Sequence, residues 1–233
     1  MENSIGFIVC SIFYSILLCY LVITKKRKNL GDKTYFSLVI INLFCLILEI
    51  TNYYTVRNIE SLQVVNSIVS KLYLLGLFTW TFVFTKHIYL VSRNISTFNR
   101  KELSLKQKRL FNLYFAIYII YCIVIVILPI NFSTKVGQIY SYGPAVQAVY
   151  IAPEVLMLFC MFLMFSAKKN VNKKNFSPIF ILIIGGIITM LIQASYPQML
   201  LSTSMETFVT FIMYFIIENS KKEAVQKNEK ENK

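Results

Sequence analysis

Residues 5–23 read IGFIVCSIFYSILLCYLVI, an uncharged apolar run that is followed at once by Lys25, Lys26, Arg27 and Lys28. A helix needs about 20 apolar residues to cross roughly 30 Å of hydrocarbon, so this run predicts a membrane-spanning helix. Only Glu2 is charged ahead of it, and a cleaved signal peptide would have a basic segment there. The basic cluster after the run therefore predicts an uncleaved first span whose N-terminus lies outside the cell.

The composition of the whole chain supports the same class of protein. Of the 233 residues, 56% are hydrophobic and 15% are charged, with a mean hydropathy of +0.59. Soluble domains are typically about 45–50% apolar and about 25% charged. Seven glycines and five prolines provide few turns for a many-stranded barrel. The predicted fold class is all-α, a polytopic integral membrane bundle of helices.

Seven apolar segments along the chain are long enough to be spans. We expect them at residues 5–23, 35–56, 68–91, 111–130, 149–166, 179–195 and 199–217. A single transmembrane domain then covers 1–217, and a basic cytoplasmic tail covers 218–233.

The basic residues alternate from one connecting segment to the next. Twenty of the 24 lysines and arginines lie in segments 24–34, 92–110, 167–178 and 218–233. The N-terminus and segments 57–67, 131–148 and 196–198 contain only two. Cytoplasmic loops are enriched in lysine and arginine, so the pattern predicts seven crossings with a cytoplasmic C-terminus. It also explains the net charge of +13 without any binding of nucleic acid.

Reporter fusions test this orientation. A reporter that is active only in the cytoplasm, fused after Lys25 or at the C-terminus, should be active, whereas one fused near residue 140 should be silent. External activity at either of the first two positions would overturn the seven-span prediction.

Polar residues recur at helical spacing inside three of the predicted spans. Asn42, Cys45, Glu49 and Asn52 are three or four residues apart, which places them on one helical face. The same spacing relates Gly185, Thr189 and Gln193 in the sixth span, and Thr203, Glu206 or Thr207, Thr210 and Tyr214 in the seventh. Because polar groups are costly in lipid, all three faces should point into the bundle.

Several of these polar groups fall in the outer half of the membrane. We interpret them as an outward-open pocket for a cationic or zwitterionic extracellular ligand. The candidate ligand-binding residues are Glu49, Asn52, Lys71, Glu154, Gln193 and Glu206. The alternative is a structural ion pair between Glu49 and Lys71, with Glu154 and Glu206 in the hydrated headgroup region.

The sequence carries no recognisable catalytic or metal-binding motif. All five cysteines lie in apolar runs, and His87 is the one histidine, so no zinc or redox site can be assembled. There is no phosphate-binding glycine loop and no GxSxG motif. We therefore expect a protein that is not an enzyme and that has no metal or cofactor.

The end of the last predicted span carries a resemblance to a known family. Residues 214–219 read YFIIEN and are followed by a charged tail, Tyr142-Gly143-Pro144 lies in an outer loop, and Gln193, Pro197, Leu200 and Leu201 surround the last hairpin. In these features the chain resembles the seven-helix N-terminal sensor region of membrane histidine kinases and diguanylate cyclases of low-GC Gram-positive bacteria. In that family the last helix typically ends in Tyr-x-x-Ile-Glu-Asn-Pro-Asp. Here Ser220 and Lys221 replace the Pro-Asp pair.

The resemblance implies a sensory or receptor module of histidine-kinase-type signalling in the bacterial plasma membrane. Residues 1–217 would be the sensor domain, and 218–233 a truncated output linker, because the sequence has no phosphoacceptor helix, ATP-binding domain or GGDEF domain. Tyr214, Glu218 and Asn219 would carry the output. The expected partners are the bilayer, a cytoplasmic kinase or cyclase transmitter and a second copy of the chain. A small-solute transporter and a non-catalytic membrane anchor subunit are the alternatives.

Overall fold

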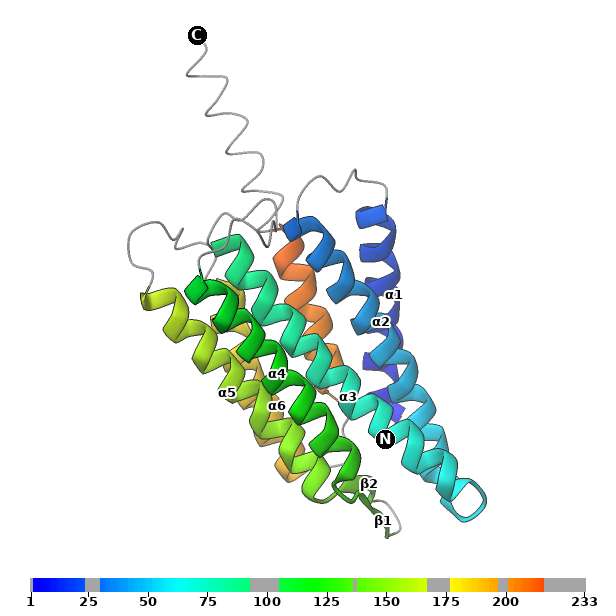
Figure 1. Cartoon of the computed structure of the whole chain (residues 1–233). Coiled ribbons are helices and arrows are strands. Elements are labelled where there is room, and N and C mark those ends of the chain that lie inside the picture. Colours follow the sequence, from blue (N-terminus) through cyan, green and yellow to red (C-terminus); the bar gives the residue numbers. More distant parts are fainter. Residues whose placement is uncertain are drawn as a thin grey trace.

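The computed structural model describes residues 2–23, 30–92, 105–135, 138–166, 177–196 and 201–215. These residues are mostly helical, as predicted. The labelled elements are α1 (Glu2–Ile23), α2 (Leu30–Arg57), α3 (Ile59–Ser92), α4 (Leu105–Ile127), β1 (Asn131–Lys135), β2 (Gln138–Tyr142), α5 (Pro144–Ser166) and α6 (Ser177–Ser195). A further helix covers residues 202–215 and is called the C-terminal helix here; it is orange in Figure 1.

Consecutive helices run in opposite directions through the bundle (Figure 1). The helix ends that flank the basic segments all lie at one end, where α1, α3 and α5 end and α2, α4 and α6 begin. We call it the basic end. The β1–β2 hairpin and the turn between α2 and α3 lie at the other end, called the hairpin end.

Helix α3 is the centre of the packing. It contacts α2 most extensively and also packs on α4 and α5. Trp80 and Phe84 stack in a core shared with α1, α2, α6 and the C-terminal helix. Nearer the hairpin end, Phe78 and Ile125 belong to a second core that joins α2, α3, α4 and α5. Both cores depend on α3, so this helix fixes the positions of the others.

The connection between α2 and α3 is shorter than the sequence suggests. The prediction of a loop over 57–67 is wrong, because α2 continues to Arg57 and α3 begins at Ile59. The turn is held by Asn58, whose backbone carbonyl accepts from the backbone N–H groups of Ser61 and Leu62. α3 has 34 residues and is kinked close to its start, at Leu62, whose backbone angles are not helical (φ −121°, ψ 26°).

The segment expected as a plain outer loop, 131–148, contains regular structure. β1 and β2 pair antiparallel, with Asn131 opposite Tyr142, so the fold is not purely α-helical. Gly143 follows with a φ of 112°, a conformation that glycine adopts without a steric penalty. Pro144 then begins α5, five residues before the predicted start at Val149, because a proline is well tolerated at the first helical position.

Two helical segments are long and apolar enough to cross a membrane, namely Asp32–Arg57 and Ile59–Leu90. By themselves they are weak evidence, because the buried core helix of a soluble protein has the same length and composition. Many large apolar side chains are nevertheless exposed on the outside of the bundle, among them Phe13 of α1, Ile120 and Ile127 of α4 and Leu191 of α6. Large exposed apolar patches are uncommon on soluble monomers.

Gly76 permits the close approach of α2 and α3. A Cβ atom placed there would lie 2.6 Å from the Sγ of the buried Cys45. We therefore expect Gly76→Ala to lower the free energy of unfolding by about 1–3 kcal/mol, measured by detergent-induced unfolding. Gly6→Ala is the matched control, since nothing lies within 4 Å of that position and alanine favours helix. Equal stability of the two variants would contradict this packing.

Candidate functional site

The bundle contains a set of buried polar side chains that follows α2, α3 and the C-terminal helix. We call this set the polar interior. Its members are Asn42, Glu49, Asn52, Thr55, Asn66, Ser70, Tyr73, Thr203, Glu206, Thr207 and Thr210. The faces predicted from the spacing on α2 and on the C-terminal helix are therefore the faces that point inward.

Glu49 lies at the centre of the polar interior with none of its surface exposed. The Tyr73 hydroxyl of α3 donates to Glu49 Oε1 over 2.9 Å. The same hydroxyl lies 3.0 Å from Oγ1 of Thr203 on the C-terminal helix. Tyr73 thus joins three helices through one oxygen atom. The second carboxylate oxygen, Glu49 Oε2, is buried and has no hydrogen-bond partner among the described residues.

A second buried carboxylate lies close to the first. Glu206 follows Thr203 by one helical turn and is 7% exposed, and its Oε2 also has no partner among the described residues. The two carboxylates are near enough to interact electrostatically, and both also interact with the thiol of Cys45. Among the described residues no lysine or arginine is buried, so no basic side chain of that part of the chain neutralises the pair in the interior.

Asn52 is engaged in the contact between α2 and α3. Its Oδ1 accepts from the Ser70 hydroxyl at 2.6 Å. One turn further along α2, the Thr55 hydroxyl donates to Oδ1 of Asn66 at 2.8 Å. These bonds tie the hairpin-end halves of α2 and α3 together, so Asn52 has a structural partner as well as a place near Glu49.

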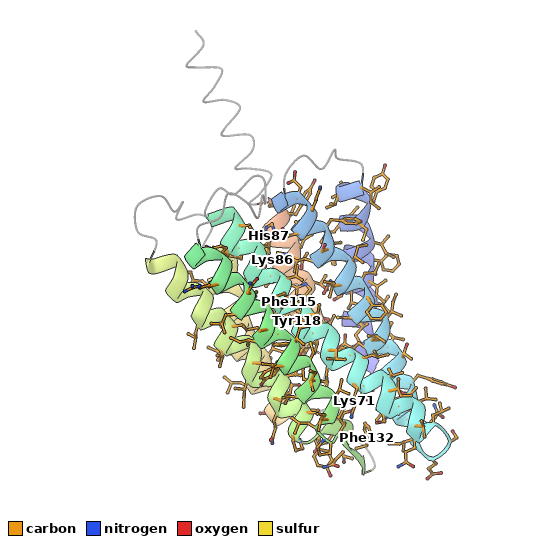
Figure 2. The ribbon with its side chains drawn as sticks, viewed as in Figure 1. Lys71, Lys86, His87, Phe115, Tyr118 and Phe132 are labelled. Atoms are coloured by element: carbon orange, nitrogen blue, oxygen red, sulfur yellow. The ribbon has the colours of Figure 1, made fainter. Side chains whose placement is uncertain are left out.

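Lys71 does not pair with Glu49. Its Nζ donates to the backbone carbonyl of Val126 on α4. Two residues along a helix correspond to a rotation of about 200° around its axis, which places the two side chains on nearly opposite faces. Tyr73 and Lys71 therefore cannot both face Glu49. Figure 2 shows Lys71 toward the hairpin end of α3, and Lys86 and His87 toward the basic end.

Four of the remaining predicted residues have side chains that the structure does not describe. Glu154 lies within α5 and Gln193 within α6, but their side chains are not described. Glu218 and Asn219 follow the last described residue, Phe215. Tyr214 is described and is partly buried, with its ring 6.5 Å from that of Tyr35.

The sequence analysis missed the polar residues that α3 contributes. Asn66, Ser70 and Tyr73 are four and three residues apart, which is the same helical spacing that identified the face of α2. A search of the third span for polar periodicity would have found all three.

A second group of polar contacts lies nearer the basic end. The Asn42 amide donates to the hydroxyls of Ser15 on α1, at 2.9 Å, and Thr207, at 2.8 Å. The Tyr35 hydroxyl donates to the backbone carbonyl of Thr210 at 2.9 Å. The hydroxyl of Thr34, the residue before Tyr35, lies 2.9 Å from His87 Nδ1 on α3. The C-terminal helix is thus held along its length by hydrogen bonds.

Among the described residues, no group of three histidine, cysteine, aspartate or glutamate side chains is placed to hold a metal ion. No known protein family matches the chain, and a search of curated proteins finds no significant match. What the chain does must therefore be argued from its own residues.

The Tyr73 bridge is open to direct test. Tyr73→Phe should lower the free energy of unfolding by about 1–3 kcal/mol, because Glu49 Oε1 and Thr203 lose a buried partner. Unfolding followed by circular dichroism measures the change. Tyr54→Phe, the same substitution on an exposed side chain, should stay within about 0.5 kcal/mol of the unmodified protein. A Tyr73→Phe variant as stable as Tyr54→Phe would show that the bridge contributes nothing.

Proposed function

We propose that the chain crosses the bacterial plasma membrane seven times, with its N-terminus outside and its C-terminus in the cytoplasm. Two observations support this proposal. Large apolar side chains are exposed while carboxylates, amides and hydroxyls are buried, which suits lipid as the surrounding solvent. The helix ends next to the lysine- and arginine-rich segments lie together at the basic end, where the positive-inside rule would place the cytoplasm.

We further propose that the bundle is a sensory module that relays a signal through its C-terminal helix. The observation that carries this proposal is how that helix is held. Polar contacts join it to α1 through Ser11 and Ser204, to α2 through Asn42 and Thr207, and to α3 through Tyr73 and Thr203. In lipid there is no hydrophobic force between helices, so polar contacts and close packing set their relative positions.

The free energies of these hydrogen bonds are small enough for the C-terminal helix to change between two positions. An interhelical hydrogen bond in a membrane contributes about 0.6 kcal/mol on average, so the three contacts together contribute roughly 2 kcal/mol. A ligand that binds the two helix positions with a difference of this size would shift their populations more than tenfold. A complete switch from 1:99 to 99:1 would need about 5.5 kcal/mol.

On this proposal, the movement of the C-terminal helix is passed to a cytoplasmic partner at the basic end. Tyr214 lies near the last described residue of the C-terminal helix and contacts Tyr35 of α2, so a movement of the helix changes this contact. The residues that follow, including Glu218 and Asn219, would pass the change to a cytoplasmic kinase or cyclase transmitter. The chain itself contains no catalytic motif of such an enzyme. A second copy of the chain would serve as partner in a signalling dimer.

Distance measurements test the relay. Spin labels at the exposed positions 20 of α1 and 215 of the C-terminal helix, in a background without native cysteines, report the separation of the two helices by pulsed paramagnetic resonance. Asn42→Ala removes the bonds to Ser15 and Thr207, and it should shift the mean distance by about 1–2 Å or add a second population.

Asn58→Ala, in the turn between α2 and α3, is the matched control and should leave the distribution unchanged. If Asn42→Ala lowers stability but preserves the distance distribution of the unmodified protein, the contacts are purely structural and the proposed relay is wrong.

A further inference from the structure

We propose that His87 is a proton-sensitive switch for the C-terminal helix: when its imidazole takes up a proton, the contacts that Tyr35 makes with that helix are loosened. The proposal rests on the proposed function for its orientation, which makes acidification of the cytoplasm the signal. It adds a regulator to the proposed relay.

His87 combines titration near neutral pH with burial. It is the one histidine of the chain, and 1% of its surface is exposed. Histidine is the side chain whose ordinary titration falls between about pH 5 and 8. It lies five residues before the end of α3 at Ser92, about 7.5 Å at 1.5 Å per residue, toward the basic end (Figure 2). Only a short distance therefore separates the proposed cytoplasmic side from a ring that is shielded from water.

The imidazole is hydrogen-bonded to α2, because its Nδ1 lies 2.9 Å from the hydroxyl of Thr34. A neutral imidazole has one donor and one acceptor nitrogen, whereas an imidazolium has two donors. With Nδ1 unprotonated, the Thr34 hydroxyl donates to it, and after proton uptake the hydroxyl has to accept instead. With Nδ1 already protonated, the new proton adds a second donor at Nε2. In both cases proton uptake changes the hydrogen bonding of the ring and gives it a positive charge.

The residue after Thr34 connects this bond to the C-terminal helix. The centroid of the Tyr35 ring lies 6.0 Å from that of the imidazole. The Tyr35 hydroxyl donates to the backbone carbonyl of Thr210 at 2.9 Å, and its ring centroid lies 6.5 Å from that of Tyr214. A continuous set of contacts therefore runs from His87 on α3, through two adjacent residues of α2, to the C-terminal helix.

The direction of the change follows from the cost of a buried charge. Tyr35 belongs to the apolar core that also contains Leu38, Phe84 and Met213. A charged ring beside such a core is costly unless it is solvated or paired. The imidazolium therefore favours an arrangement in which water reaches the ring at the basic end, where α2 begins. We expect acidification to weaken the contact between Tyr35 and Thr210 and to move the C-terminal helix.

Other ionisable groups surround the basic end of the bundle. On the helices they are Cys19 and Tyr20 of α1, Asp32, Lys33 and Tyr35 of α2, Lys86 and Tyr89 of α3, Lys106, Lys108, Arg109 and Tyr114 of α4, Cys160 of α5 and Tyr214 of the C-terminal helix, while α6 has none. Cysteine, tyrosine, lysine and arginine ordinarily titrate above about pH 8. Asp32 precedes Thr34 by two residues, which places it on nearly the opposite face of α2. His87 is thus the group of this set that both contacts Thr34 and titrates near neutral pH.

Nuclear magnetic resonance and the distance measurement together test the switch. Because the chain has a single histidine, ¹⁵N-histidine labelling of the purified protein in lipid nanodiscs, without a histidine tag, gives signals of His87 alone. The ring should titrate between about pH 5 and 8. With the same midpoint, the distance between spin labels at positions 20 and 215 should shift by about 1–2 Å or gain a second population. A ring that does not titrate in this range, or a distance that is independent of pH, would refute the switch.

Variants identify the group that responds. His87→Gln keeps a hydrogen-bonding side chain that cannot take up a proton in this range, so the distance should no longer depend on pH. Asp32→Asn is the matched control, since it removes an ionisable group from the same end and should retain the response. Thr34→Val keeps the imidazole and removes its partner, so it provides a second variant if His87→Gln fails to fold; the ring should still titrate while the distance change becomes smaller. A response that survives in His87→Gln, disappears in Asp32→Asn or keeps its full size in Thr34→Val would contradict the proposal.

These outcomes are separate from those of the relay. A distance that changes in Asn42→Ala but not with pH would retain the relay and refute the switch. A pH-dependent distance that requires His87, together with an unchanged distance in Asn42→Ala, would retain the switch and refute the relay as proposed.

Discussion

A carboxylate with no exposed surface constrains everything packed around it. Glu49 lies between α2, α3 and the C-terminal helix, where an isolated charge or an unbonded oxygen is costly. The Tyr73 hydroxyl satisfies one oxygen and reaches Thr203 with the same atom, so three helices are positioned by a single polar group. Close packing of α2 against α3 at Gly76 and Cys45 brings the two helices near enough for this bridge to form.

The polar interior and the apolar exterior depend on each other. In a soluble protein, buried hydroxyls and amides such as those of Asn42 and Thr207 would compete with water before folding, and each bond would add little. If lipid surrounds the bundle, as proposed, the apolar side chains of α1 and α4 gain nothing from burial, and specificity would come from polar contacts and from shape. This division would explain why α4, whose described surface is largely exposed and apolar, contributes little to the candidate site.

Most of what the sequence could predict about the candidate site came from the helical spacing of its polar residues. It placed Asn42, Glu49 and Asn52 on the inward face of α2, because a spacing of three and four residues fixes direction regardless of the partner. It could not identify the partner, since facing the interior does not say which helix lies opposite. Lys71 was paired with Glu49 by depth in the membrane, yet depth ignores rotation about the helix axis, and Tyr73 takes the inward position. Helix ends were the least predictable feature: the start of α5 at Pro144 and the extension of α3 to Ile59 lie outside the apolar runs.

Thermodynamic linkage would connect the proposed extracellular signal with the proposed output. If an extracellular ligand favours one position of the C-terminal helix, then anything that holds the helix in that position must raise the affinity for the ligand by the same factor. A cytoplasmic partner bound at the basic end would therefore change the binding of an extracellular ligand without touching it. If the C-terminal helix exchanges its three polar contacts between two positions, as proposed, the coupling is limited to their combined free energy of roughly 2 kcal/mol. A coupling of that size changes affinity about thirtyfold, which is enough for graded signalling but short of an all-or-none switch.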